Sequence, residues 1–322
     1  FQTIVVVYVC CAIILELRCE SEPLLLTPFI DSGRLGEARE LSKVQPFLLD
    51  IKSYAGYFTV NKETESHLYF WFFPCTNVSR QSAPLILWLA GGPGITSLYG
   101  LFEENGPFEV ANDGQTVRNR VYAWTNNYQM LYIDQPVGTG FSFTQNETHG
   151  YISTQEEVGN HLYEALLQFY AMFNEFKSND LYVGGESYAG KYAPALALKI
   201  HHINHQAKTA KIPMAGLIIM SGYSDPENML EYGQVLYELG LIDESERKKL
   251  EAEQEAVKRM IRSKKWCLAS AMQNQLLQSW MKMLNTTSRY DYTTNHLQTR
   301  IPFVDFVAKN ETRKRIHAYV QS

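Results

Sequence analysis

The chain has 322 residues, of which 45% are hydrophobic and 13% aromatic, so it can bury a large core in one or two domains. Its formal net charge is −5, and no block of basic residues occurs along it. This charge pattern argues against nucleic acid or an anionic membrane as the main partner.

The first feature along the chain is an uncharged apolar run at residues 3–15, TIVVVYVCCAIIL, followed by ELRCESEP. A membrane-spanning helix needs about 20 apolar residues, and this run is shorter. It is typical of the apolar centre of a secretory signal peptide, so residues 1–19 are predicted to be a signal peptide. The alternative is a buried N-terminal strand or helix. After removal of the signal we expect no membrane association.

Four N-x-S/T sequons support a secretory-pathway protein, either secreted or lysosomal, with glycosylation predicted at Asn77, Asn146, Asn285 and Asn310. Of the five cysteines, only Cys75 and Cys267 remain once the signal peptide is removed. An even pair in an oxidising compartment permits a disulfide between them. The alternative is two free or separately paired thiols.

The elements after the signal peptide alternate between strands and helices. Residues 55–61 and 67–74 are β-rich runs joined by a polar turn, which predicts a hairpin. The apolar runs at 83–90 and 128–133 are typical of central strands covered on both faces, and each leads into a Gly/Pro-rich loop. A capping box at Ser153 and Glu156 predicts the start of a helix, with Leu162, Leu166, Phe169 and Phe173 on its apolar face.

The pattern continues with a strand at 180–185, a helix from 188 and a strand from 214. Such alternation predicts an α/β fold with a mostly parallel sheet and helices on both faces, in which ligands bind at the carboxyl ends of the strands. We assign the core to residues 20–226.

From residue 227 the sequence becomes helical, with charge drifting from acidic to basic along it. Residues 227–285 are therefore predicted to form a helical insertion or cap on the core. The only later strand-like run is IPFVDFV at 301–307, so residues 286–322 are interpreted as the truncated start of the C-terminal part of the core, without the last strands of the sheet.

The stretch from Gly185 to Gly190, GESYAG, places a serine between a predicted strand and a helix of small residues. Small neighbours at a tight strand-to-helix turn are typical of the nucleophile elbow of α/β-hydrolases, which makes Ser187 the candidate nucleophile. Ala189 stands where the strict G-x-S-x-G pattern has its second glycine. Taken alone, the stretch could be an ordinary Gly/Ser turn.

A second Gly-rich loop strengthens the interpretation of Ser187. Acyl transfer needs two backbone N–H donors aimed at the developing oxyanion, each contributing about 3 kcal/mol to lowering the barrier. One donor normally follows the nucleophile, and the other comes from a loop after an earlier strand. The loop WLAGGPG at 88–94 follows such a strand.

Five motifs in this order, WLAGGPG, ENGPFEV, DQPVGTGFSF, GESYAGKYAPALA and GYSDPENM, resemble the serine carboxypeptidase family. The segment PLLLTPFIDSGRLGEARELSKV is similar to its vitellogenic-like branch. The resemblance runs from about residue 23 to about residue 240. It implies the α/β-hydrolase fold and removal of C-terminal residues from peptides or proteins with a free C-terminus, at acidic pH and without cofactor or metal.

The resemblance also implies roles for individual residues. Ser187 matches the acylated nucleophile, and the amides of Gly92 and Tyr188 match the oxyanion hole. Glu186 and Glu104, together with Gly91, match the group that binds the C-terminal carboxylate of the peptide. A carboxylate binds another carboxylate only if a proton is shared, and two neighbouring acids raise one pKa. The alternative for Glu104 and Glu186 is ordinary surface charge.

The chain departs from the family pattern at several positions near the expected cleft. Ile95 and Thr96 replace smaller residues of the loop, and Met220 and Ser221 stand where the family has a Gly-Asn/Asp pair before its next glycine. The catalytic acid and histidine should follow the serine in the chain, but neither family motif occurs. The remaining candidates are poor ones: Asp225, His201, His202, His205, His296 and His317.

We therefore interpret the chain as an incomplete serine carboxypeptidase. The first alternative is a secreted, non-catalytic protein of the same fold without a complete triad. The second is an acyltransferase or esterase that uses the same serine.

Ala90 generates a prediction about substrate recognition. The family usually has an amide side chain at this position, which helps to bind the substrate carboxylate, and alanine cannot donate such a bond. A hydrogen bond to a charged group is worth about 1.5–3 kcal/mol. We expect the selectivity for a free C-terminus to be weaker than with an amide side chain at this position, measured as the ratio of kcat/KM for a peptide acid and its amide. A strong preference for the acid would contradict this expectation.

Overall fold

The computed structural model describes residues 22–45, 49–77, 82–206, 212–288, 290–293 and 301–319. It divides into two compact units: a core unit up to Gly222 and again from Pro302, and a helical unit from Tyr223 to Ile301. The helical unit is thus longer at both ends than the insertion expected at 227–285. The predicted signal peptide at 1–19 lies outside the described residues.

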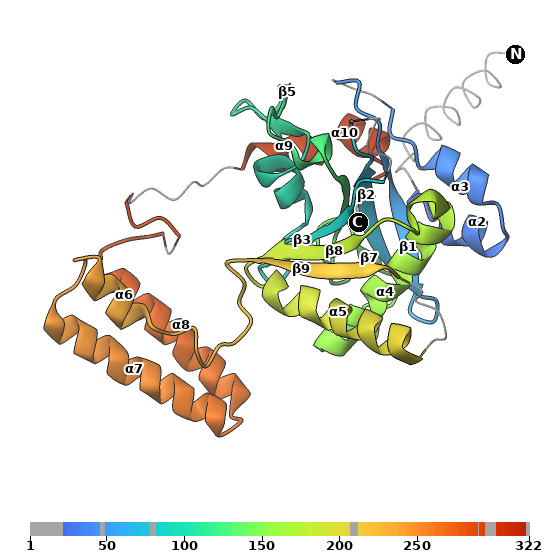
Figure 1. Cartoon of the computed structure of the whole chain (residues 1–322). Helices are drawn as coiled ribbons and strands as arrows, with labels where there is room; N and C mark the ends of the chain where they lie inside the picture. The colour runs from blue at the N-terminus through green and yellow to red at the C-terminus, as the bar shows by residue number, and fades with distance from the viewer. Residues whose placement is uncertain are drawn as a thin grey trace, which may run out of the picture. The chain divides into compact units, whose positions relative to one another are not determined.

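A mixed sheet of seven strands forms the core unit (Figure 1). Its order is β1-β2-β6-β3-β8-β9, with β7 beside β2. The bounds are β1 (Tyr54–Asn61), β2 (Ser66–Phe73), β3 (Leu85–Leu89), β6 (Gln129–Ile133), β7 (Phe143–Thr144), β8 (Leu181–Glu186) and β9 (Met214–Met220). The predicted hairpin is present as β1 and β2, whereas β6, β3, β8 and β9 run parallel. The parallel strands therefore end at one edge of the sheet, where ligands bind in such folds.

The sheet is covered on both faces, as the apolar run of β3 predicts. Leu87 and Leu89 belong to one buried cluster, whereas Ile86 and Trp88 belong to a second cluster on the opposite face. The first cluster includes residues of α3 (Leu35–Leu41), α4 (Gln155–Met172), η3 (Asn174–Phe176) and α5 (Ala189–Gln206). The second is formed with the π-helical turn η1 (Gly100–Glu104), β4 (Phe108–Val110), β5 (Val117–Asn119), η2 (Trp124–Asn126) and α9 (Pro302–Ala308), which α10 (Asn310–Arg315) follows.

The short run at 301–307 is not a strand, so this prediction was wrong. It forms α9, in which Phe303, Phe306 and Val307 are buried at helical spacing. Pro302 is the first residue of the helix, where a missing N–H costs nothing. The run is too short for its apolar residues to distinguish the two periods before the structure is seen.

The capping box of α4 lies one residue later than predicted. Thr154 Oγ1 accepts a hydrogen bond from Glu157 N at 3.2 Å, and Glu157 Oε2 accepts one from Thr154 N at 2.9 Å. Both Ser153–Glu156 and Thr154–Glu157 fit the same four-residue pattern, so the sequence alone does not choose between them.

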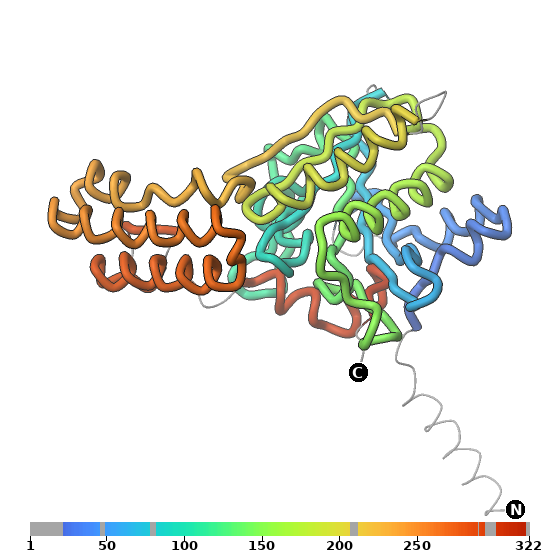
Figure 2. Tube along the Cα trace, turned by 90° about the horizontal axis from the view of Figure 1, so that it is seen from below, coloured from blue at the N-terminus to red at the C-terminus, as the bar shows by residue number. Residues whose placement is uncertain are grey.

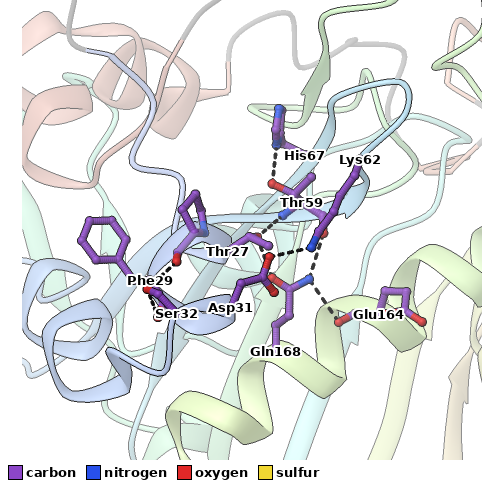
Figure 3. A network of polar contacts seen from close by, with 10 residues as sticks. Thr27, Phe29, Asp31, Ser32, Thr59, Lys62, His67, Glu164 and Gln168 are labelled. Atoms are coloured by element: carbon purple, nitrogen blue, oxygen red, sulfur yellow. Dashed lines mark hydrogen bonds and ion pairs between the residues drawn. The ribbon is translucent and has the colours of Figure 1, made fainter.

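The N-terminal segment that contains α2 (Thr27–Asp31) is fastened to the sheet and to α4 through Thr27 (Figure 3). Thr27 Oγ1 accepts a hydrogen bond from Thr59 N at 2.7 Å and donates one to Gln168 Oε1 at 2.6 Å. Gln168 Nε2 in turn donates to Thr59 O at 2.9 Å. An ion pair between Lys62 and Asp31 adds a surface contact. This segment is therefore an integral part of the core unit.

Strand β9 forms one edge of the sheet in the part of the chain that the structure describes. None of the described residues pairs with its outer edge, and Leu217, Ile219 and Met220 are exposed on it.

The helical unit consists of α6 (Tyr232–Glu238), α7 (Glu244–Arg262) and α8 (Trp266–Met283), which lie side by side (Figures 1 and 2). Leu236, Leu250 and Leu276 bring the three helices together in a small core of their own. A capping box starts α7, because Asp243 accepts from Glu246 N at 2.9 Å and Glu246 accepts from Asp243 N at 3.0 Å. The acidic-to-basic drift along α7 also suits the helix dipole.

Candidate active site

Ser187 lies in the turn between β8 and α5, as the elbow pattern predicts. Its φ is +55°, a left-handed conformation that few residues other than glycine adopt. The turn is held in place because Ser187 N donates to Met220 O at the end of β9 and Gly190 N donates to Ser187 O, both at 3.0 Å. The serine side chain is only half buried. A strained, half-exposed serine at the carboxyl end of a central strand is suited to nucleophilic attack.

Two glycines allow the loop after β3 to touch this turn directly. A Cβ on Gly185 would lie 2.2 Å from Leu89 O and 2.6 Å from Ala189 Cβ. A Cβ on Gly91 would lie 2.5 Å from Tyr188 N and 2.8 Å from Glu186 O. Backbone therefore packs on backbone, with no room for a side chain at either glycine. The contact places the Gly-rich loop beside Ser187 and Tyr188.

The rest of this loop adopts conformations that favour glycine. Gly92 and Gly94 have φ of +104° and +84°. The two substitutions expected to crowd the loop behave differently. Ile95 is 47% exposed, and its Cγ1 lies 2.9 Å from the position that a Cβ on Gly92 would occupy. Thr96 instead points inward and donates from Oγ1 to Asp134 Oδ1 at 2.6 Å. Only Ile95 therefore presents a bulky apolar group to solvent at the loop.

Asp134 is a structural residue that the sequence analysis missed. It is 1% exposed and accepts hydrogen bonds from Thr96 Oγ1, from Ser97 N at 2.8 Å and from Phe141 N at 2.9 Å. Burial raises the pKa of Asp134 to about 6, against the effect of these bonds. A Cβ on Gly140 would lie 2.0 Å from Asp134 Oδ2. Asp134 therefore links the Gly-rich loop to the loop after β6. The signal in the sequence that could have identified Asp134 was its position directly after an apolar strand.

The structure brings the two predicted acids, Glu104 and Glu186, together. Glu104 ends η1, and Glu186 is the last residue of β8 and the neighbour of Ser187. A hydrogen bond joins the two carboxyl groups, and Trp88 Nε1 donates to Glu104 Oε2 at 3.0 Å. Burial, the hydrogen bond to Glu186 and the charge of Glu186 raise the pKa of Glu104 to about 8. Glu104 therefore keeps at neutral and acidic pH a proton that it can share with Glu186.

A glycine also makes the approach of Trp88 to this pair possible. A Cβ on Gly100 would lie 2.4 Å from the Trp88 indole and 3.1 Å from Glu104 Oε2. Next to this group, Ala90 is buried, and its amide N donates to Ser97 Oγ at 3.2 Å.

The weak candidates for a catalytic base or acid that the structure describes in the core unit do not join this group. His201, His202 and His205 are exposed on α5 and contact one another. His317 Nε2 lies 3.1 Å from Lys43 O, which neighbours β1 on the far side of the sheet from β8. Asp225 is in the helical unit, where Asn228 Nδ2 donates to it, and His296 lies outside the described residues. Within the described ranges, no histidine is hydrogen-bonded to Ser187.

The remaining candidate residues are the two cysteines and the asparagines of the four sequons. Cys75 and Cys267 are free thiols in the structure, the first half buried in the core unit and the second exposed on α8. The sequon asparagines Asn77, Asn285 and Asn310 are exposed, and Asn146 is half buried.

No helix in the described part of the chain is long and apolar enough to cross a bilayer. No cluster of three or more His, Cys, Asp or Glu side chains that could bind a metal ion occurs among the residues that the structure places.

Comparison with known proteins gives a consistent result. A model of the family "Serine carboxypeptidase" matches residues 43–320. The chain is 44% identical to human "Probable serine carboxypeptidase CPVL" and 39% identical to the vitellogenic carboxypeptidase of Aedes aegypti, in each case over 92% of this chain and 64% of the relative. The chain thus spans a little under two thirds of the length of these curated relatives.

A solved structure agrees with the sequence comparison. The fold is similar to that of Kex1, a prohormone-processing carboxypeptidase from Saccharomyces cerevisiae, with a TM-score of 0.73 and 26% identity over 87% of this chain and 68% of that one.

The contact at Gly91 generates a prediction about stability. Gly91→Ala places a methyl group 2.5 Å from Tyr188 N, so the loop or the turn must move. Overpacking of this kind costs about 1–3 kcal/mol, which corresponds to a fall in Tm of several degrees, measured by thermal unfolding. Gly36→Ala is the matched control, because a Cβ there meets nothing within 4 Å. An unchanged Tm for Gly91→Ala would show that the loop does not rest on the turn.

Proposed function

The chain belongs to the serine carboxypeptidase family and has its α/β-hydrolase fold, and from this premise we propose that the whole protein removes C-terminal residues from peptides through an acyl-enzyme on Ser187. The observation that carries the proposal is the carboxyl pair of Glu104 and Glu186 directly beside Ser187. A serine alone would suit an esterase, an acyltransferase or an endopeptidase equally well.

The carboxyl pair favours a substrate with a free C-terminal carboxylate. Two ionised carboxylates would repel such a group, whereas a pair with a shared proton can donate a hydrogen bond to it. Because the pKa of Glu104 is raised to about 8, the donor form is present at acidic and neutral pH and is lost above that range. Glu186 adjoins Ser187 in the chain, so a peptide anchored there by its C-terminus presents its last peptide bond to the serine.

The backbone donors for the oxyanion are proposed to be the amides of Gly92 and Tyr188. The close packing of Gly91 on Tyr188 N brings these two parts of the chain together on one side of Ser187. Donors fixed by the fold need little rearrangement as charge develops, and each contributes about 3 kcal/mol.

Acylation of Ser187 also needs a base and an acid that orients it. Since none of the described histidines contacts Ser187, the proposal is made for the full-length protein, in which the order serine, acid, histidine is expected along the chain. The rival function is a non-catalytic protein that binds peptide C-termini at the same carboxyl pair.

The cellular setting is proposed from the sequence. The predicted signal peptide at 1–19 and the sequons at Asn77, Asn146, Asn285 and Asn310 support passage through the secretory pathway, with a secreted or lysosomal destination. The acidic lumen of such a compartment would keep the proton on the pair of Glu104 and Glu186.

The function is tested with the full-length protein, a peptide with a free C-terminus and a fluorophosphonate label. We expect release of the C-terminal residue and labelling of Ser187 in the wild type. Ser187→Ala should lose the label and lower kcat by about 10⁴-fold or more. Ser32→Ala is the matched control, because Ser32 is exposed at the end of α2. An unlabelled, inactive wild type that still binds peptide acids would favour the non-catalytic function instead.

A further inference from the structure

Arg120 contacts the short turn that carries Glu104 on both sides of that residue. Its Nη2 donates to Phe102 O at 2.5 Å, and its Nε donates to Gly106 O at 3.1 Å. Phe102 lies two residues before Glu104 and Gly106 two residues after it. The planar guanidinium thus bridges two carbonyl groups on either side of Glu104, which a single ammonium group cannot do with the same geometry.

The side chain of Arg120 is itself held in place. It is 18% exposed, and its Nη1 lies 3.9 Å from Glu109 Oε2. The backbone also fixes its position, because Arg120 N donates to Pro107 O at 2.9 Å. These contacts hold the half-buried guanidinium against the turn that carries Glu104.

Two further hydrogen bonds hold this single π-helical turn. Asn105 N donates to Gly100 O at 2.9 Å, and Tyr132 Oη donates to Asn105 Oδ1 at 2.7 Å. Tyr132 of β6 thus holds the turn on the side of the sheet, and Arg120 holds it on the outer side. The carboxyl of Glu104 then meets Trp88 on β3 and Glu186 on β8.

Arg120 also contributes charge. Its positive charge lowers the pKa of Glu104. This effect opposes burial and the hydrogen bond and negative charge of Glu186, which all raise that pKa. The other charged groups that line this surface are Glu103, Glu109, Asp113 and Arg118, and the charge of Arg120 also opposes the rise in the pKa of Glu103. Arg120 is therefore the cation that acts on Glu104 in a mainly acidic environment.

From these contacts we infer that Arg120 is a positioning residue for the carboxylate anchor, because it fixes the turn that places Glu104 against Glu186. The inference rests on the proposed carboxypeptidase function. Arg120 is proposed to contact neither Ser187 nor the substrate. Its effect is therefore on binding of the peptide C-terminus rather than on acyl transfer.

Three variants of the full-length protein separate geometry from charge. Arg120→Lys keeps the positive charge but loses the simultaneous hydrogen bonds to Phe102 O and Gly106 O, whereas Arg120→Met loses both the charge and the hydrogen bonds. Arg118→Met is the matched control, because Arg118 is an exposed arginine of β5 that lines the same surface pocket. The measurement is the pH dependence of kcat and KM for a peptide acid, with the Tm of each variant as a check on folding.

We expect KM to rise about tenfold or more in both Arg120 variants, as loss of a charge-assisted hydrogen bond predicts, with a much smaller change in kcat. In the wild type, kcat/KM should decline above about pH 8, where Glu104 loses its proton. Removing the cation raises the pKa of Glu104, so the decline should lie about half a pH unit higher in Arg120→Met than in Arg120→Lys. Arg118→Met should match the wild type in KM and in the alkaline limb.

Each other outcome has a definite meaning. If the wild type hydrolyses peptide acids but both Arg120 variants keep its KM, or if their alkaline limbs coincide, the inference about Arg120 is wrong and the carboxypeptidase proposal stands. If the wild type does not act on peptides at all, the proposed function is the part that fails. Should Arg120→Met not fold, Arg120→Lys with an unchanged KM would still overturn the positioning role.

Discussion

The whole site depends on the parallel pairing of β3 with β8, in which Leu89 lies opposite Gly185. In this register β3 and β8 end at the same level. The loop that follows β3 must therefore pass close to the turn that follows β8. Glycine at 91 and 185 lets the two backbones touch. A side chain at either position would separate the Gly-rich loop from the turn of Ser187, and the proposed oxyanion donors with it.

The same edge of the sheet also explains how two acids from distant parts of the chain come to share a proton. Trp88, on the face of β3 opposite Leu89, reaches Glu104 because Gly100 leaves space for its indole. Glu186 arrives from β8 at the residue before the serine. The proposed nucleophile and one member of the proposed carboxylate anchor are thus consecutive residues.

Much of this arrangement could be predicted from the sequence. The β1–β2 hairpin, the apolar strand β3 and the helical unit have strong local patterns, and the small residues around Ser187 predict a tight turn. The meeting of Glu104 with Glu186 did not follow from spacing; only the resemblance to the family suggested it. The structure now supplies its geometry.

Other features could not be predicted, for identifiable reasons. The run at 301–307 was taken for a strand, because a few apolar residues fit both periods and only packing against the second core cluster decides for helix α9. Asp134 and Arg120 were missed because their importance lies in contacts with backbone groups of other loops. A sequence pattern contains no information about such partners. The different orientations of Ile95 and Thr96 have the same reason, because Thr96 turns inward toward a buried acceptor, Asp134.

The central claim is that Glu104 and Glu186 hold a shared proton beside Ser187. The most direct measurement is the infrared spectrum of the full-length protein as a function of pH, taken as the difference between the wild type and Glu104→Gln. The account predicts a protonated-carboxyl band at pH 6 that is absent from the variant and disappears with a midpoint near pH 8, where the pKa of Glu104 lies. A difference spectrum that shows only ionised carboxylate at pH 6 would contradict it.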